Sequence, residues 1–221
     1  MGSFAIGYER FCRMLLMVFI VNIAIVVHTI IGIVILGLFP SIAAAYATYR
    51  TWLLSDDKGW TVRETWTTFH AAWREDIISA SLFGWAQTAV FAVLAYSYWL
   101  VLHNDMGTLG YAASGVLLLA LVFMGLFSFL SWVVRANFAE PNRWAVRMTL
   151  QMIIARPICS LLTILLFLLT ICIWALWPGI LMVFGISVPI GLMMVVAYYY
   201  GRLPGMTPPD KPVHNKREAA Q

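Results

Sequence analysis

The chain is poor in charge, and its long apolar segments contain no aspartate or glutamate. Only 11% of its 221 residues are charged, whereas 62% are apolar. Soluble domains carry about a quarter charged residues, so this composition excludes an ordinary soluble domain. Carboxylates inside membrane helices usually mark proton or sodium relays. Their absence from the apolar segments argues against an ion-coupled pump.

The sequence also lacks the signatures of common catalytic and nucleotide-binding sites. It contains no Walker A loop, no HExxH, no GxSxG and no glycine-rich dinucleotide fingerprint. Its three cysteines show no paired spacing, which argues against a metal or redox site. We therefore expect a non-enzymatic protein without catalytic residues, metal or cofactor. The basic residues are spread over several loops rather than collected in one patch, so nucleic acid is not an expected partner.

What the sequence does have is a set of apolar segments long enough to cross a membrane, which takes about 20 residues. They cover residues 11–54, 77–102, 111–134 and 157–200. We expect an all-α, multi-pass membrane helix bundle with five or six membrane segments, forming a single domain over residues 1–203. The remaining residues, 204–221, carry proline and lysine without an apolar period, and we expect a disordered tail there.

Lysine and arginine gather on one side of this arrangement. The connections at residues 103–110 and 177–179 contain neither, whereas the other connections and the tail contain several. Basic residues mark the cytoplasmic ends of membrane helices, and there they also attract anionic lipid headgroups. We therefore expect a cytoplasmic C-terminus and membrane lipids as partners.

The first apolar segment, residues 11–54, leaves two topologies open. As one helix it would be about 66 Å long, roughly twice the hydrocarbon thickness. In the favoured topology the chain turns near residues 28–32 at the outer face and returns to the inner face with a kink at Pro40. In the alternative, residues 14–38 form one tilted span and residues 41–54 an interfacial helix. The available break points are Gly32, Gly37 and Pro40.

Three polar residues interrupt this first segment. We expect Asn22 to bond to a neighbouring helix and His28 to lie at the outer turn, although either could instead line a cavity. Arg50 could bind a lipid phosphate or a partner carboxylate, or extend to the inner surface.

Two segments have the pattern of amphipathic helices that lie at the inner face. Thr61 and Glu64 match a capping box, after which apolar residues recur every three or four positions. A second such helix begins near Pro141 and ends at Arg156, because the residue before a proline avoids the helical region. Each is followed by two apolar segments, so the chain contains a candidate parallel repeat. Its members are residues 61–134 and 141–200, and Pro189 is a candidate hinge in the last segment.

Two motifs resemble those of a bacterial membrane protein family. The first is Leu36-Gly37-Leu38-Phe39-Pro40-Ser41-Ile42-Ala43-Ala44 with Arg50-Thr51-Trp52, which resembles the "GlfPa…A…vRkw" signature of the YesL-like proteins. The second covers residues 68–76 and 81–84 and is similar to an aromatic-rich helix of that family. In it, Asp76-Ile77 replaces the usual phenylalanine, and Ser81 stands where asparagine is common.

The resemblance implies a protein of the bacterial cytoplasmic membrane from a family without a defined activity. The genes of that family often stand beside those for sugar-binding proteins and permeases of ABC importers. We therefore expect an accessory or regulatory component of carbohydrate ABC import, with permease subunits as partners. The expected inner-face contacts with partner or lipid are Arg50, Trp66, Phe69, Trp73 and Arg74, and the expected structural motif is Gly37 with Pro40.

The alternative function is that of a small carrier or channel for a neutral solute, acting alone or as a homo-oligomer. Broken helices often line the binding sites of transporters. The broken segment at residues 32–40 would then lie at the binding site.

Overall fold

Every element in the described part of the chain is helical. The computed structural model describes residues 2–104, 107–138 and 140–201, and no strand occurs among them. The expected all-α helix bundle is thus confirmed, while the expected tail at 204–221 lies outside the described residues. The elements are α1 (Gly2–Ile31), α2 (Leu38–Leu54), α3 (Val62–Glu75), α4 (Ile77–His103), α5 (Gly107–Asn137), α6 (Asn142–Ala155), α7 (Pro157–Leu176), α8 (Pro178–Phe184), α9 (Ser187–Val196) and the π-helix η1 (Ala197–Gly201).

Four of these helices are long and apolar enough to cross a membrane, namely α1, α4, α5 and α7. The apolar stretch of α8, α9 and η1 forms a fifth candidate, which is bent by 74°. α2, which would be the sixth, has only 17 residues. The chain is thus a multi-pass membrane protein with four candidate membrane segments, or five if the bent stretch is one span, where five or six were expected.

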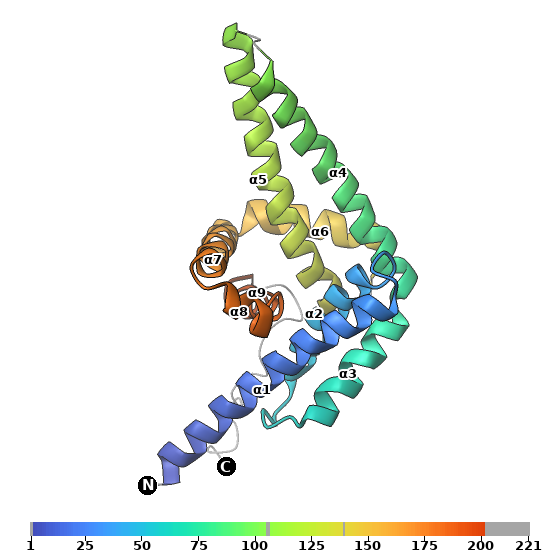
Figure 1. Ribbon diagram of the computed structural model, residues 1–221, viewed down its shortest axis with the longest axis vertical. Helices are drawn as coiled ribbons and strands as arrows, with labels where there is room; N and C mark the ends of the chain where they lie inside the picture. The colour runs from blue at the N-terminus through green and yellow to red at the C-terminus, as the bar shows by residue number, and fades with distance from the viewer. Residues whose placement is uncertain (1, 105–106, 139, 202–221) are drawn as a thin grey trace, which may run out of the picture.

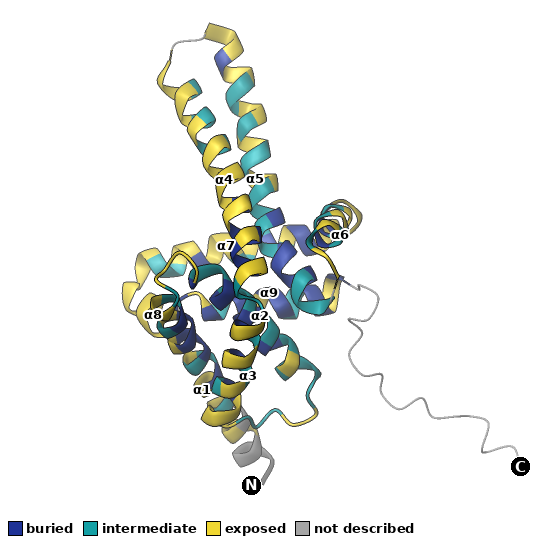
Figure 2. Cartoon of the chain, turned by 90° about the vertical axis from the view of Figure 1, so that its right-hand side faces the viewer, coloured by how far each residue is buried: buried dark blue, intermediate teal, exposed yellow. Residues whose placement is uncertain are grey.

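The helices form two arms that meet at a common base (Figure 1). α1, α2 and α3 pack against one another in one arm, and α4 and α5 form a long hairpin that rises away from it. α6 packs against the lower part of α5, and α7 to α9 pack against α5, α2 and α1. Figure 2 shows that buried residues gather where the arms meet, whereas the upper hairpin is largely exposed. The side chains at the base are therefore the most buried, and a site built there would have fixed walls.

The turn between α1 and α2, residues 32–37, lies beside the lower part of α4. The carbonyl oxygen of Ile35 accepts a hydrogen bond from Trp85 Nε1 at 2.8 Å, and that of Leu36 accepts one from Ser81 Oγ at 3.4 Å. From Trp85 to His103 at the upper end of α4 is roughly 27 Å at 1.5 Å per helical residue. The favoured topology, which placed this turn level with the 103–110 connection, is therefore wrong.

The expected kink at Pro40 is also absent from the described helix. α2 begins at Leu38, so Pro40 lies in its first turn, where a missing N–H breaks no intrahelical hydrogen bond. Gly37 precedes α2 at a point where its backbone lies against the end of α1. A Cβ there would lie 2.5 Å from the carbonyl oxygen of Thr29. Ile33 and Val34 have φ angles of 53° and 59°, a left-handed conformation that β-branched residues rarely adopt. The turn is therefore strained and is held in place by α4.

The two short amphipathic helices begin and end where the sequence predicts. In α3, Thr61 Oγ1 accepts a hydrogen bond from the amide of Glu64 at 3.2 Å, and the Glu64 carboxylate accepts one from the amide of Thr61 at 2.7 Å. α6 ends at Ala155, and Pro157 is the first residue of α7. α3 packs against α1 and α2, whereas α6 packs against α5 and α7. The two members of the candidate repeat thus share their helix order but have different neighbours.

The last apolar segment breaks at Gly185, whereas Pro189, the candidate hinge, lies within α9. Gly185 has a φ of 38°, and a Cβ there would lie 2.4 Å from Oδ1 of Asn22. Asn22 Nδ2 donates to the carbonyl oxygens of Met182 and Val183 at 3.3 and 3.1 Å. The expected bond from Asn22 to a neighbouring helix is therefore confirmed, and it supplies donors to carbonyls near the break.

Candidate functional site: a charged cavity at the base of the hairpin

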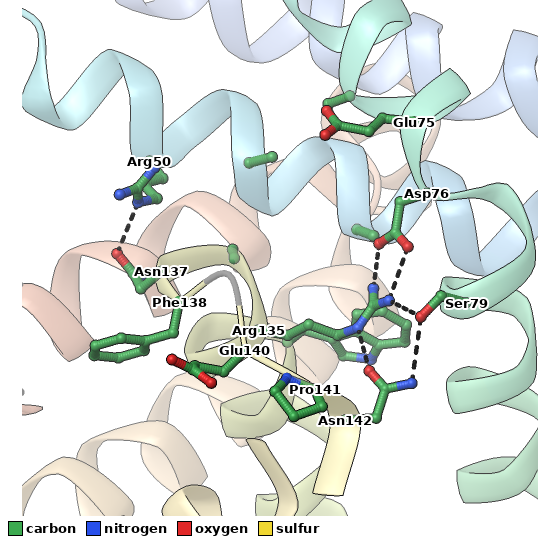
Figure 3. Close-up of a pocket in the computed structure, with 15 residues that line it drawn as sticks. Arg50, Glu75, Asp76, Ser79, Arg135, Asn137, Phe138, Glu140, Pro141 and Asn142 are labelled. Carbon is green, nitrogen blue, oxygen red and sulfur yellow. Dashed lines mark hydrogen bonds and ion pairs between the residues drawn. The ribbon is translucent and has the colours of Figure 1, made fainter. Parts of the chain in front are cut away.

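A charged cavity lies at the base of the α4–α5 hairpin. Its volume is about 780 Å³, and α2, the junction of α3 with α4, and the connection from α5 to α6 form its walls (Figure 3). The charged side chains that line it are Arg50, Glu75, Asp76, Arg135 and Glu140. The rest of the lining consists mostly of small or aromatic residues, so the charges dominate the chemistry of the cavity.

Arg135 is fully engaged in the wall of this cavity. Its two terminal nitrogens contact both carboxylate oxygens of Asp76, one of them at 2.9 Å, and Nη2 also donates to Ser79 Oγ at 2.7 Å. Nε donates to Asn142 Oδ1 at 3.1 Å. The guanidinium group lies 5.5 and 5.7 Å from the ring centroids of Phe83 and Trp132. Arg135 therefore fastens α4, α5 and α6 together and has little capacity left for a ligand.

Arg50 enters the cavity from α2 with fewer partners. Its Nε donates to Asn137 Oδ1 at 3.2 Å, and the hydroxyl of Tyr198 donates to the same oxygen at 3.4 Å. Figure 3 shows the side chain of Arg50 beside Asn137 and on the opposite side of the cavity from Asp76. Within the described residues, the terminal nitrogens of Arg50 have no hydrogen-bond or ion-pair partner. They can therefore bind an anionic group.

Two carboxylates of the cavity also lack partners. Glu75 ends α3, and Glu140 precedes α6. Neither carboxylate forms an ion pair or a side-chain hydrogen bond within the part of the chain that the structure describes. Among the residues that the structure describes, the cavity therefore offers one free cation and two free anions. This arrangement can hold a ligand that carries both signs of charge.

The predicted inner-face residues of α3 fall into two groups. Phe69 and Trp73 are only 0% and 9% exposed and pack against the ring of His28. Their prediction as partner or lipid contacts is wrong, because the apolar stripe of α3 faces α1. Trp66 is partly exposed and Arg74 exposed, and both line a shallow groove on the outward face of α3.

The sequence reasoning missed several residues that build the base of the hairpin. Asp76 and Arg135 lie 59 positions apart in the sequence, and Asn137 lies 87 positions from Arg50. A signal was available, because charged residues at both ends of an apolar helical hairpin come together when its helices pack antiparallel. His28 was expected at an outer turn but is buried against α3, which corrects that prediction.

Part of the chain matches a known family model. Residues 18–98 match the family described as "Protein of unknown function, DUF624". The matched region contains the turn at 32–37, all of α3 and the Asp76 side of the cavity, so these features lie within the part that is similar to that family. No curated protein and no solved structure matches the chain.

Proposed function

We propose that this membrane protein is a non-enzymatic accessory or regulatory component of carbohydrate ABC import in a bacterial cytoplasmic membrane, with its C-terminus in the cytoplasm. The resemblance to YesL-like proteins supports the transport context. The structural observation that carries the proposal is the outward face of α3. That face presents Trp66, His70 and Arg74 around a shallow groove.

This face is suited to docking because the opposite side of α3 is packed against other helices. Phe69 and Trp73 on the inward side of α3 are buried against α1 and α2. The outward side chains are therefore held in place before any partner arrives, which lowers the entropy lost on binding. Tryptophan and arginine are also the residues that most often dominate the energy of protein interfaces. We assign this face to contact with a permease subunit.

The alternative of a carrier or channel for a neutral solute receives less support. It requires unpaired polar groups in the broken segment at residues 32–40. The carbonyl oxygens of Ile35 and Leu36 there already accept hydrogen bonds from Trp85 and Ser81. Each of these two oxygens therefore already has a partner on α4.

The test is purification of the tagged full-length protein from its native membrane in mild detergent, followed by mass spectrometry. We expect permease or ATPase subunits in near-equal amounts. Arg74→Glu should reduce their recovery, whereas Arg63→Glu, which is also exposed on α3 but lies outside the groove, should not.

Failure to recover any importer subunit, under conditions that preserve known importers, would contradict the proposal. A homo-oligomer recovered without other subunits would instead favour the carrier.

A further inference from the structure

A second cavity adjoins the charged one. It lies between α4, α5 and α7, has a volume of about 580 Å³ and is lined mainly by apolar side chains. Trp132 lines both cavities and stacks on Phe39 with 6.2 Å between ring centroids. A charged cavity and an apolar cavity thus share one wall at the base of the hairpin. This pairing matches the two halves of an amphiphile.

The free charges of the first cavity restrict the headgroup of such an amphiphile. The planar guanidinium of Arg50 suits a phosphate oxygen. A headgroup with only negative charge would meet the unpaired carboxylates of Glu75 and Glu140, which repel it. A primary ammonium group supplies three N–H donors to these carboxylates. A quaternary ammonium group supplies none, and proteins usually bind it in aromatic cages instead.

We propose that the two cavities bind one phospholipid that has a primary ammonium headgroup, of the phosphatidylethanolamine class. The phosphodiester lies at Arg50, the ammonium group at one of the two unpaired carboxylates, Glu75 or Glu140, and one acyl chain in the apolar cavity. The proposal does not depend on the role in carbohydrate import, because it concerns the purified protein alone.

The headgroup is tested by native mass spectrometry of the full-length protein in detergent. The probes are phosphatidylethanolamine, phosphatidylcholine and phosphatidylglycerol with identical acyl chains, added in equal amounts. We expect preferential retention of phosphatidylethanolamine. Arg50→Gln should lower this retention about tenfold, the size expected for the loss of one charge-assisted hydrogen bond. Arg147→Gln, an exposed arginine of α6 outside both cavities, should have no effect.

Further substitutions test the roles of the two carboxylates and of the apolar cavity in lipid binding. Glu75→Gln combined with Glu140→Gln should remove the preference for phosphatidylethanolamine over phosphatidylcholine. Gly125→Leu should lower retention of all three lipids, because Gly125 lines the apolar cavity and a Cβ there meets no atom within 4 Å. Gly115→Leu is the matched control on the same helix, since it is equally unobstructed but lies outside that cavity.

Three results would overturn the proposal. The first is equal retention of the three lipids, or a preference for phosphatidylglycerol. The second is unchanged retention in Arg50→Gln or Gly125→Leu, with thermal unfolding confirming that each variant is folded. The third is full displacement of the lipid by an equal concentration of soluble O-phosphoethanolamine, which would assign the charged cavity to a free phosphoamine.

Discussion

His28 on α1 accepts a hydrogen bond from His70 on α3, with 3.0 Å between Nε2 of His28 and Nδ1 of His70. The direction follows from the other ring nitrogen of His28, because Nδ1 lies 2.9 Å from the carbonyl oxygen of Ala24 and must donate to it. Nε2 of a neutral His28 is then the acceptor. The ring also contacts three aromatic side chains of α3, those of Trp66, Phe69 and Trp73. One imidazole therefore organises the contact between α1 and α3.

Removing this imidazole should weaken the first arm. We expect His28→Ala to lower the free energy of unfolding by about 3 kcal/mol, because it leaves a cavity among aromatic rings. His70→Ala should cost about 1 kcal/mol, the contribution of one hydrogen bond. Unfolding in detergent measures both. Their effects should not add in the double variant, and strict additivity would show that the two residues do not interact. His103→Ala, exposed at the far end of α4, is the control.

Gly84 should resist even the smallest substitution. A Cβ at this position would lie 2.1 Å from Cγ of Phe39, in the ring that separates α2 from α4. Gly84→Ala should therefore destabilise the fold by about 2 kcal/mol through overpacking. Combining it with Phe39→Leu should recover part of the loss in thermal unfolding. No recovery would place the cause elsewhere, and Gly115→Ala, with open space around it, should be tolerated.

The pair of Asp76 and Arg135 should make a measurable contribution to stability. The side chain of Arg135 is only 10% exposed, so Asp76→Asn leaves a mostly buried guanidinium without its anionic partner. We expect a loss of about 3 kcal/mol in the free energy of unfolding. Glu75→Gln, next in sequence and without a described partner, should change it little. Equal effects of the two substitutions would mean that the pair contributes no more than general surface charge.

The capping box of α3 should make stability depend on pH in the acid range. Hydrogen bonds from the amide and hydroxyl of Thr61 lower the pKa of Glu64 below its ordinary value of 4.5. The unfolded chain therefore takes up this proton first as the pH falls. The contribution of the box is complete above pH 4.5 and is lost as the pH falls through the pKa of the folded state. Between pH 6 and 3, the midpoint temperature of thermal unfolding should fall less steeply for Glu64→Gln than for the unchanged protein. Parallel curves would contradict this assignment.

The ends of the helices could be predicted because they depend on neighbouring residues. Thr61 with Glu64 caps α3, and the pair Arg156-Pro157 separates α6 from α7. The place of the turn at 32–37 could not be predicted in the same way. It depends on donors from Ser81 and Trp85, which lie 45 and 50 positions away.

The candidate site was predictable only in part, for a related reason. The apolar stripe of α3 was correctly identified, but a stripe does not show whether lipid or another helix covers it. Phe69 and Trp73 therefore belong to the predicted stripe, but they pack against α1 instead of lipid or a partner protein. Arg50 was expected either to bind a lipid phosphate or partner carboxylate or to extend to the inner surface, and the structure places it in a charged cavity. Asp76 and Arg135 meet there only because α4 and α5 pair in one particular register.

The bend at Gly185 bears on how the protein is made. Asn22, which supplies hydrogen bonds to carbonyls near the bend, lies in the first helix of the chain and emerges from the ribosome long before Gly185 does. Unsatisfied carbonyls are costly in lipid. Without the donors of Asn22, a straight helix is therefore the more favourable form of this segment in the bilayer. The bent form of this segment therefore depends on its contact with α1.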